Sequence, residues 1–155
     1  METISRTIRH DEVLGLEAFC LQGYAQPFPR HFHDYYVLGF VVSGEQELLC
    51  NGLSLQVFPG NLLIFNPRDN HECVSTSRAP FLHYLGFNIL KKRMEEISME
   101  LTGESCLPQF KLTVFSDESA CNAFLELHKL IIQRSDELRK EELFYLLFSR
   151  LFGKY

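Results

Sequence analysis

Apolar and polar residues in the first three-fifths of the chain follow the patterns of short β-strands. Aromatic and β-branched residues are frequent in 17–24 and 35–50, and the run LSLQVF at 53–58 alternates apolar with polar positions, as a strand with one buried face does. Turn signals, Asn-Gly at 51–52 among them, separate these runs. Three further strands are expected at 62–65, 71–75 and 81–89. Short strands repeating at intervals of about ten residues predict an antiparallel sandwich or barrel.

After residue 89 the hydrophobic pattern changes to the period of an α-helix. Helix-forming residues at 91–101 precede Gly103, which predicts a helix that stops there. A second helix is expected over 117–133, capped by Ser116 or Asp117. Its buried stripe is predicted from steps of three and four residues: Ala120, Phe124, Leu127 and Ile131.

The last helix is unusually apolar. It is expected from about Asp136 to Phe152, with Gly153 as its stop. One barrel and one neighbouring helix leave part of so apolar a surface uncovered, so we predict a homodimer in which the same patch meets itself. The predicted interface consists of Leu143, Phe144, Leu147, Phe148 and Leu151, with Leu146 widening the apolar arc. The alternative is a monomer in which the barrel and the helix at 117–133 cover the whole arc.

Composition and charge exclude several classes of protein. The formal net charge of the 155 residues is −5, which argues against nucleic-acid binding by this chain alone, because phosphate contacts need a basic surface. Five cysteines without a C-x-x-C pair favour free thiols over a disulfide framework or a zinc knuckle. We expect a soluble cytoplasmic protein, since neither a signal peptide nor an apolar run of ~20 residues is present. No P-loop, G-x-S-x-G or H-E-x-x-H motif occurs.

Two histidines, His31 and His33, stand two residues apart at the start of an apolar run. Side chains alternate between the faces of an extended chain, so both imidazoles point to the same side. His71 follows at the start of a later predicted strand. Such histidines can hold a metal ion, supply polar groups to a ligand pocket, or be structural residues with backbone partners.

These histidines and the nearby turn residues resemble the two sequence motifs of cupins, over about residues 23–88. The residues that carry the resemblance are Gly23, His31, Phe32, His33 and Gly44, then Pro59, Gly60, Pro67 and His71. In metal-binding cupins the first motif supplies two histidines and a glutamate, and the second supplies one histidine. The glutamate position falls here on Val37 or Leu38, and neither side chain can bind a metal. We therefore expect no metal or other cofactor and assign the three histidines to a ligand pocket or its rim.

A longer resemblance covers about residues 25–152. The stretches P-x-H-x-H-D at 29–34, V-x-S-G at 41–44 and PGNLLIFNP at 59–67, followed by two helices, resemble the N-terminal regulatory domain of the AraC family of transcription regulators. This resemblance implies an α+β fold, with a cupin-like (jelly-roll) antiparallel β-barrel and N-terminal arm over 1–89 and a helical dimerisation subdomain over 90–155. It also implies that DNA is bound only through a C-terminal helix-turn-helix domain, which is absent from this chain.

The same resemblance places a small-molecule effector inside the barrel. His83 occupies a position where the family has a polar pocket residue, and it shares a predicted strand face with Phe81 and Leu85. The predicted ligand-binding residues are His31, His33, Tyr35, His71, Cys73, Phe81, His83 and Leu85. A partly apolar ligand suits this lining, and a sugar is less favoured because the chain has no Trp. The alternative is that the aromatic and aliphatic members are ordinary core residues.

The polar N-terminal stretch TISRTIRHDEV is open to two interpretations. In the AraC family such an arm can fold over the ligand, so that Arg6, Arg9 and His10 contact an anionic effector or the DNA-binding domain. The alternative is a frayed terminus.

The resemblance predicts a regulator that is not an enzyme, and two other functions stand beside it. The first is a small metal-dependent cupin enzyme, an isomerase or dioxygenase, that uses His31, His33 and His71; the missing glutamate and the helical tail argue against it. The second is a structural dimerisation domain whose pocket no longer binds anything.

Overall fold

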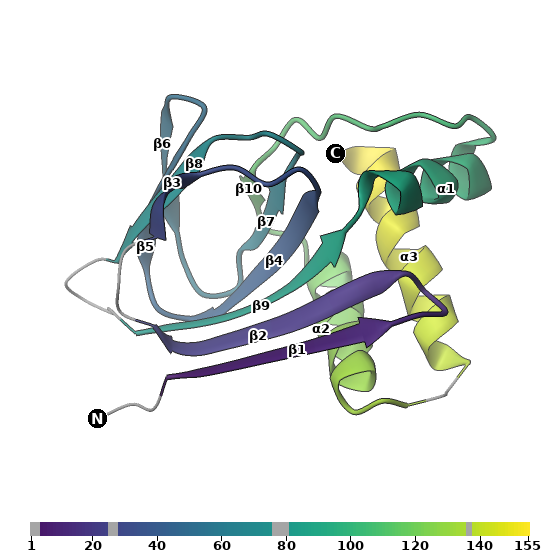
Figure 1. The fold of residues 1–155 in the computed structure, drawn as a ribbon, viewed down its shortest axis with the longest axis horizontal. Helices are drawn as coiled ribbons and strands as arrows, with labels where there is room; N and C mark the ends of the chain where they lie inside the picture. Colours follow the sequence, from purple (N-terminus) through teal and green to yellow (C-terminus); the bar gives the residue numbers. More distant parts are fainter. Residues whose placement is uncertain (1–3, 25–27, 76–80, 136–137) are drawn as a thin grey trace.

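The strands of the computed structural model form two antiparallel sheets that face each other and enclose a barrel (Figure 1). The structure describes residues 4–24, 28–75, 81–135 and 138–155. In strand order, the six-stranded sheet contains β1 (Ser5–Asp11), β2 (Leu16–Tyr24), β9 (Leu82–Ile89), β4 (Tyr36–Ser43), β7 (Leu62–Phe65) and β10 (Val114–Phe115). The four-stranded sheet contains β3 (Phe28–His31), β8 (His71–Ser75), β5 (Gln46–Cys50) and β6 (Leu53–Val57).

Turn residues set the strand boundaries. Asn51 and Gly52, with φ of +49° and +83°, form the β5–β6 hairpin turn that the Asn-Gly pair predicts. The apolar run at 35–50 is divided between β4 and β5 at Gly44, whose φ is +93°. A Cβ at Gly44 would lie only 2.7 Å from the carbonyl oxygen of Phe81, so this turn requires glycine.

Three helices follow or flank the last strands: α1 (Lys91–Thr102), α2 (Glu118–Ile132) and α3 (Arg139–Lys154). The left-handed Gly103 ends α1, and the Asp117 side chain caps α2 by accepting from the N–H of Ala120, as predicted. Gly153 does not end the last helix, because α3 continues to Lys154. The predicted start of that helix at Asp136 lies outside the described residues.

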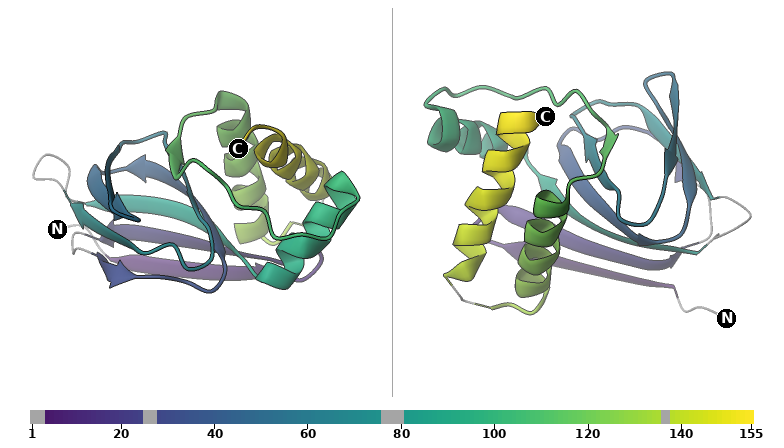
Figure 2. Two further views of the ribbon diagram at one scale, coloured as in Figure 1. Left: turned by 90° about the horizontal axis from the view of Figure 1, so that it is seen from above. Right: turned by 180° about the vertical axis from the view of Figure 1, so that it is seen from behind.

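The helices α2 and α3 lie side by side against the outer face of the six-stranded sheet, as the view from behind shows (Figure 2). The predicted α+β fold, a cupin-like antiparallel barrel followed by a helical hairpin, is confirmed. Among the described residues, no helix is long and apolar enough to cross a membrane.

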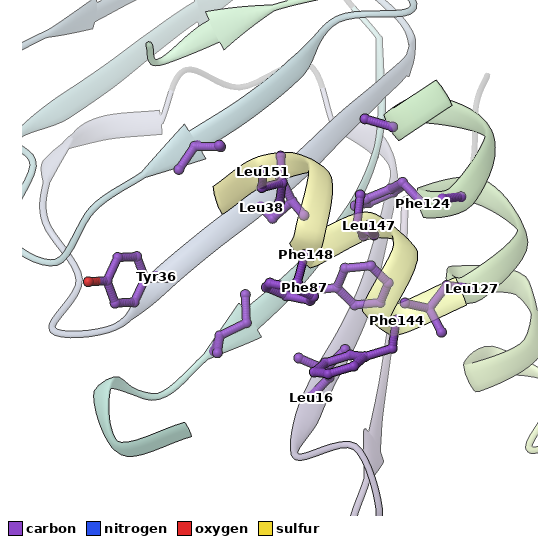
Figure 3. Packing of buried hydrophobic residues seen from close by; sticks show 14 of the residues in the cluster. Leu16, Tyr36, Leu38, Phe87, Phe124, Leu127, Phe144, Leu147, Phe148 and Leu151 are labelled. Carbon is purple, nitrogen blue, oxygen red and sulfur yellow. The ribbon is translucent and has the colours of Figure 1, made fainter. Parts of the chain in front are cut away.

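The larger of the two hydrophobic clusters fills the space between this sheet and the helices (Figure 3). It contains all five residues predicted for a dimer interface, and each of them is at most 2% exposed: Leu143, Phe144, Leu147, Phe148 and Leu151. These side chains are buried within the chain itself and are not available to a second copy, contrary to the prediction.

The cover for α3 comes from segments that the prediction did not count. Met94 and Ile97 of α1 and Phe110 from the segment before β10 belong to the same cluster. The guanidinium of Arg93 lies 5.2 Å from the centre of the Phe144 ring. The sheet, α1, α2 and the 103–113 segment together cover the five residues of the predicted interface, whereas Leu146 stays 56% exposed.

The N-terminal stretch is not a frayed end over the described residues. β1 pairs with β2 along its whole length, from Ser5 opposite Gln22 to Asp11 opposite Leu16. The carboxylate of Asp11 accepts from the N–H of Leu14 and lies 2.6 Å from Nζ of Lys140 in α3. The turn between β1 and β2 is therefore fastened to the helical layer.

Candidate ligand-binding cavity

A cavity of about 280 Å³ lies inside the barrel, between the inner faces of the two sheets. Its walls are mainly apolar and include Phe19, Val41, Phe65 and Leu82. Its polar lining comes from both ends of the barrel: Arg6, His31, His33, Tyr35, Gln46, His71, Tyr84 and Asn88. A largely apolar pocket with a few polar groups is the usual environment for a small organic ligand.

Two glycines allow aromatic rings to lie inside the barrel. A Cβ at Gly39 would collide with the hydroxyl end of Tyr84, and a Cβ at Gly86 would collide with the ring of Phe19. The two rings lie 5.5 Å apart, centre to centre, and both line the cavity. The absence of side chains at the two glycines therefore shapes the pocket wall.

The three histidines of the cupin-like motifs come together at one end of the cavity. His31, in β3, pairs with His71 of β8, and their rings are 4.3 Å apart. The ring of His33 lies 4.8 Å from that of His31 and stacks on Tyr35. The sequence prediction that these histidines share one side is confirmed.

Backbone carbonyl groups fix the orientation of two of these imidazoles. Nδ1 of His31 lies 2.6 Å from the carbonyl oxygen of Pro29, and Nδ1 of His71 lies 2.9 Å from that of Asp69. A carbonyl oxygen only accepts, so Nδ1 carries the proton in both rings and Nε2 of the neutral ring holds a lone pair. His71 is further fixed by stacking on Phe65, with ring centres 3.9 Å apart.

Two imidazoles of the histidine cluster, those of His33 and His71, have lowered pKa values and are uncharged at neutral pH. Burial, followed by the neighbouring His31 and His71, lowers the pKa of His33 to about 4. Burial also lowers the pKa of His71. For both rings a neighbouring imidazole adds to the effect of burial, because a positive charge on one ring disfavours a charge on the next.

By its donor atoms, the cluster fits a transition-metal ion. The candidate ligand atoms of His31, His33 and His71 all lie within 4.8 Å of one another, and carbonyl-anchored imidazoles are typical metal ligands. Of the two residues at which the cupin glutamate would fall, Val37 lines the cavity and Leu38 belongs to the helix-side cluster. The carboxylate of Glu17 accepts from the Asn88 amide at 2.9 Å and is not part of the metal-ligand group found among the described residues. A metal here would thus be held by three neutral ligands.

Two of the other predicted ligand residues line the cavity and three do not. Tyr35 and Cys73 are in the lining, and burial raises the pKa of the Cys73 thiol to about 12, so that it stays protonated. Phe81 is 44% exposed. His83 and Leu85 lie on the outer face of β9, where Nε2 of His83 is 3.6 Å from Sγ of Cys20 and Leu85 packs against the helix-side cluster.

The choice of strand face was wrong because β9 is covered on both sides. Its inner residues line the cavity and its outer residues meet the helices, so both faces carry apolar side chains and hydrophobic alternation does not distinguish them. The inner positions are Leu82, Tyr84, Gly86 and Asn88.

Sequence reasoning missed two polar residues that line the cavity, and it left the role of a third, Arg6, undecided. Gln46 and Asn88 were not singled out, although strict alternation in β5 puts Gln46 on the same face as Leu48 and Cys50. Arg6 was one of the candidates in the N-terminal arm, and it lines the cavity. Arg9 pairs with Ala18, on the opposite face of the sheet.

The comparisons with known proteins point to a family of regulators. A family model described as the AraC-like ligand binding domain matches residues 15–148. The uncharacterized HTH-type transcriptional regulator YbfI of Bacillus subtilis (strain 168) is 39% identical over 155 residues, which are 100% of this chain and 56% of that protein. The chain therefore spans about half the length of this curated relative.

Two solved structures are similar to part of this chain. KdgF from Halomonas sp. matches 55% of this chain and 77% of its own length, with 24% identity and a TM-score of 0.46. An RmlC-like cupin family protein with a double-stranded β-helix fold, from Methanocaldococcus jannaschii, matches 58% and 91%, with 10% identity and a TM-score of 0.46. At these scores the likenesses carry no further argument.

Proposed function

Because the chain belongs to the family of AraC-like ligand binding domains, we propose that it is the effector-sensing part of a transcription regulator. The observation that supports this function most directly is the cavity of about 280 Å³ inside the barrel, with apolar walls and separate polar groups. In this proposal a small molecule binds there, in the cytoplasm, and controls a DNA-binding domain that lies outside this chain. The role of the chain is binding and not catalysis.

A screen of small molecules by thermal unfolding tests the proposal. A ligand that binds only the folded chain, at 100 times its Kd, adds about 2.7 kcal/mol to the free energy of unfolding. The control is Val41→Phe, which puts a larger side chain into the cavity wall. We expect a true effector to stabilise the wild type and not this variant. A library that stabilises neither protein, or a hit that stabilises both equally, would contradict the proposal.

A buried contact offers a route from the cavity to the helices. The ring of Phe19 lines the cavity. The backbone carbonyl oxygen of Phe19 accepts a hydrogen bond from Nε2 of His128 in α2 at 2.8 Å. His128 is 4% exposed and stacks on Phe124. A ligand that displaces Phe19 would move the acceptor of this hydrogen bond, and α2 would respond.

Homodimerisation is kept as a proposal, on a different surface. The inward stripe of α3 is buried within the chain, but Leu146 of α3 is 56% exposed and Leu125 of α2 is 37% exposed. We propose that a dimer uses these outward residues of the two helices. Light scattering on the wild type and on Leu146→Glu tests this. The wild type should be dimeric and the variant monomeric, whereas a monomeric wild type at high micromolar concentration excludes the dimer.

The histidine cluster supports a second candidate function, a metal-dependent cupin enzyme. His31, His33 and His71 would hold the ion, which would supply Lewis acidity to a bound substrate. Elemental analysis of protein purified without chelator and then dialysed separates the two functions. The binding domain is expected to hold no stoichiometric metal. A metal that survives dialysis, and is lost in His33→Ala but kept in His83→Ala, would favour the enzyme.

A further inference from the structure

One permanently charged side chain reaches the cavity from the N-terminal strand. Arg6 of β1 stands opposite Leu21 of β2, and both residues line the cavity. Arg6 is the only exposed residue of the cavity lining that the structure describes, so it lies where the interior of the barrel meets solvent. Three residues further along the same strand, Arg9 stands opposite Ala18, on the outer face of the sheet. The two arginines of β1 therefore face different surroundings.

The charge of Arg6 is not balanced within the cavity. The protein has 20 Asp and Glu residues and a formal net charge of −5, yet the described cavity lining contains no carboxylate. Over the described ranges of the chain, Arg6 takes part in no ion pair. An arginine keeps its charge at any physiological pH. The mouth of the cavity thus carries a fixed positive charge in an otherwise acidic protein.

The hydroxyl group of Tyr35 adds a neutral donor within the electrostatic reach of Arg6. Burial, followed by Glu17, raises the pKa of Tyr35, and the charge of Arg6 opposes this effect only in part. The phenol therefore stays protonated at neutral pH and can donate a hydrogen bond. Much of the remaining wall is apolar, with Phe19 and Leu63 among its residues. A positive charge at the mouth and an apolar interior together suit a ligand with an anionic group and an apolar body.

We propose that the effector is a small organic acid, whose anionic group binds the guanidinium of Arg6 and whose apolar body lies inside the barrel. The proposal rests on the function proposed above and adds the chemical class of the ligand. A guanidinium can form two parallel hydrogen bonds with a carboxylate. A cationic ligand is disfavoured, because the described lining has no carboxylate to balance its charge and Arg6 repels it.

Pairs of an acid and its amide test the class, because the two members of a pair differ in charge and little in shape. The probes are benzoate with benzamide and hexanoate with hexanamide, so that both an aromatic and an aliphatic body are covered. Titrations followed by ¹H–¹⁵N NMR at neutral pH give the dissociation constants, which are expected on the order of millimolar at this size. We expect the better-fitting acid to bind about 3–10-fold more tightly than its amide, a range that allows for the exposure of Arg6.

Three substitutions assign this preference to one side chain. Arg6→Gln removes the charge and should weaken the acid about 3–10-fold while leaving the amide within about 2-fold. Arg6→Lys keeps the charge without the planar fork and should retain part of the preference. The matched control is Arg9→Gln, which removes the same charge from the outer face of the same strand and should retain the whole preference. Binding of both members of the pair should be lost in Val41→Phe, because they occupy the cavity.

The outcomes separate this proposal from the function on which it rests. A preference for the acid that survives in Arg6→Gln, or that falls equally in Arg9→Gln, would overturn the proposal, because Arg6 would then be only one of the solvated charges of the protein. Amides that bind as tightly as the acids also overturn it, and their loss in Val41→Phe would leave an effector site in the barrel intact. No binding by any of the four compounds overturns the class as well, and the wider screen then decides separately whether the cavity has an effector.

Discussion

The two faces of the six-stranded sheet have opposite characters, although they belong to the same strands. The outer face meets the helices in a closely packed cluster in which Phe87, Phe124 and Phe148 are fully buried. The inner face lines a cavity, and the strands and loop opposite it hold the unpartnered amide nitrogen of Gln46 and the three histidines. The comparison indicates that the helix side supplies stability and that the barrel interior is kept open for binding, since unfilled space and unpaired polar groups both reduce stability.

The largest expected difference between the faces comes from removing one aromatic ring on each. Phe87 faces the helices and is 0% exposed, whereas Phe19 faces the cavity and is 9% exposed. Phe87→Ala should cost about 3–5 kcal/mol of unfolding free energy, and Phe19→Ala clearly less, because it enlarges a space that already exists. Urea denaturation of both variants measures this. Equal losses would remove the distinction between the two faces.

A pair of histidines gives a smaller contrast. His128, on the helix side, is buried and hydrogen-bonds the carbonyl oxygen of Phe19, so His128→Ala leaves that acceptor unpaired and should cost on the order of 2 kcal/mol. His33 lies at the cavity end and is only partly buried, so His33→Ala should cost less than about 1 kcal/mol. A larger loss for His33→Ala would make that histidine a structural residue.

Much of the fold was predictable from local signals in the sequence. The Asn51–Gly52 turn, the Asp117 cap and the Gly103 stop each depend on a few adjacent residues, and all three are found as expected. The H-x-H spacing placed His31 and His33 correctly on one side. Decisions that depend on tertiary packing were not predictable in this way.

Two of those decisions were wrong for the same physical reason. β9 is covered on both faces, so the pattern could not tell that Tyr84 rather than His83 points into the cavity. The apolar arc of α3 predicted a partner, and the chain supplies that partner itself through α1 and the segment that contains Phe110. In both cases hydrophobicity showed that a side chain is covered but not which element covers it.

A third effect depends on pH and concerns Asp117, a charged residue on the helix side that caps α2 and contacts Arg150 of α3. Burial raises the pKa of Asp117, but hydrogen bonds from Arg150, the N–H of Ala120 and Tyr155 outweigh it and lower the pKa to about 2. The unfolded value is about 3.9. The resulting stabilisation, about 2 kcal/mol, is fully present above pH 4 and is lost as the pH falls through 4 toward 2.

The control for this effect is Asp117→Asn, which can still cap α2 but carries no charge. Between pH 5 and pH 2, the free energy of unfolding of this variant should fall by about 2 kcal/mol less than that of the wild type. Identical pH dependence of wild type and variant would mean that the Arg150–Asp117 contact, at 2.8 Å, contributes nothing to stability.

The most direct test of the whole account is to map a bound ligand with methyl signals from the two faces. Val37 and Leu38 are adjacent in β4, yet Val37 lines the cavity and Leu38 belongs to the helix-side cluster. With an effector from the screen bound, ¹H–¹³C NMR spectra should show large shifts for the methyl groups of Val37 and small ones for those of Leu38. Larger shifts at Leu38 than at Val37 would place the ligand on the helix side and contradict the account.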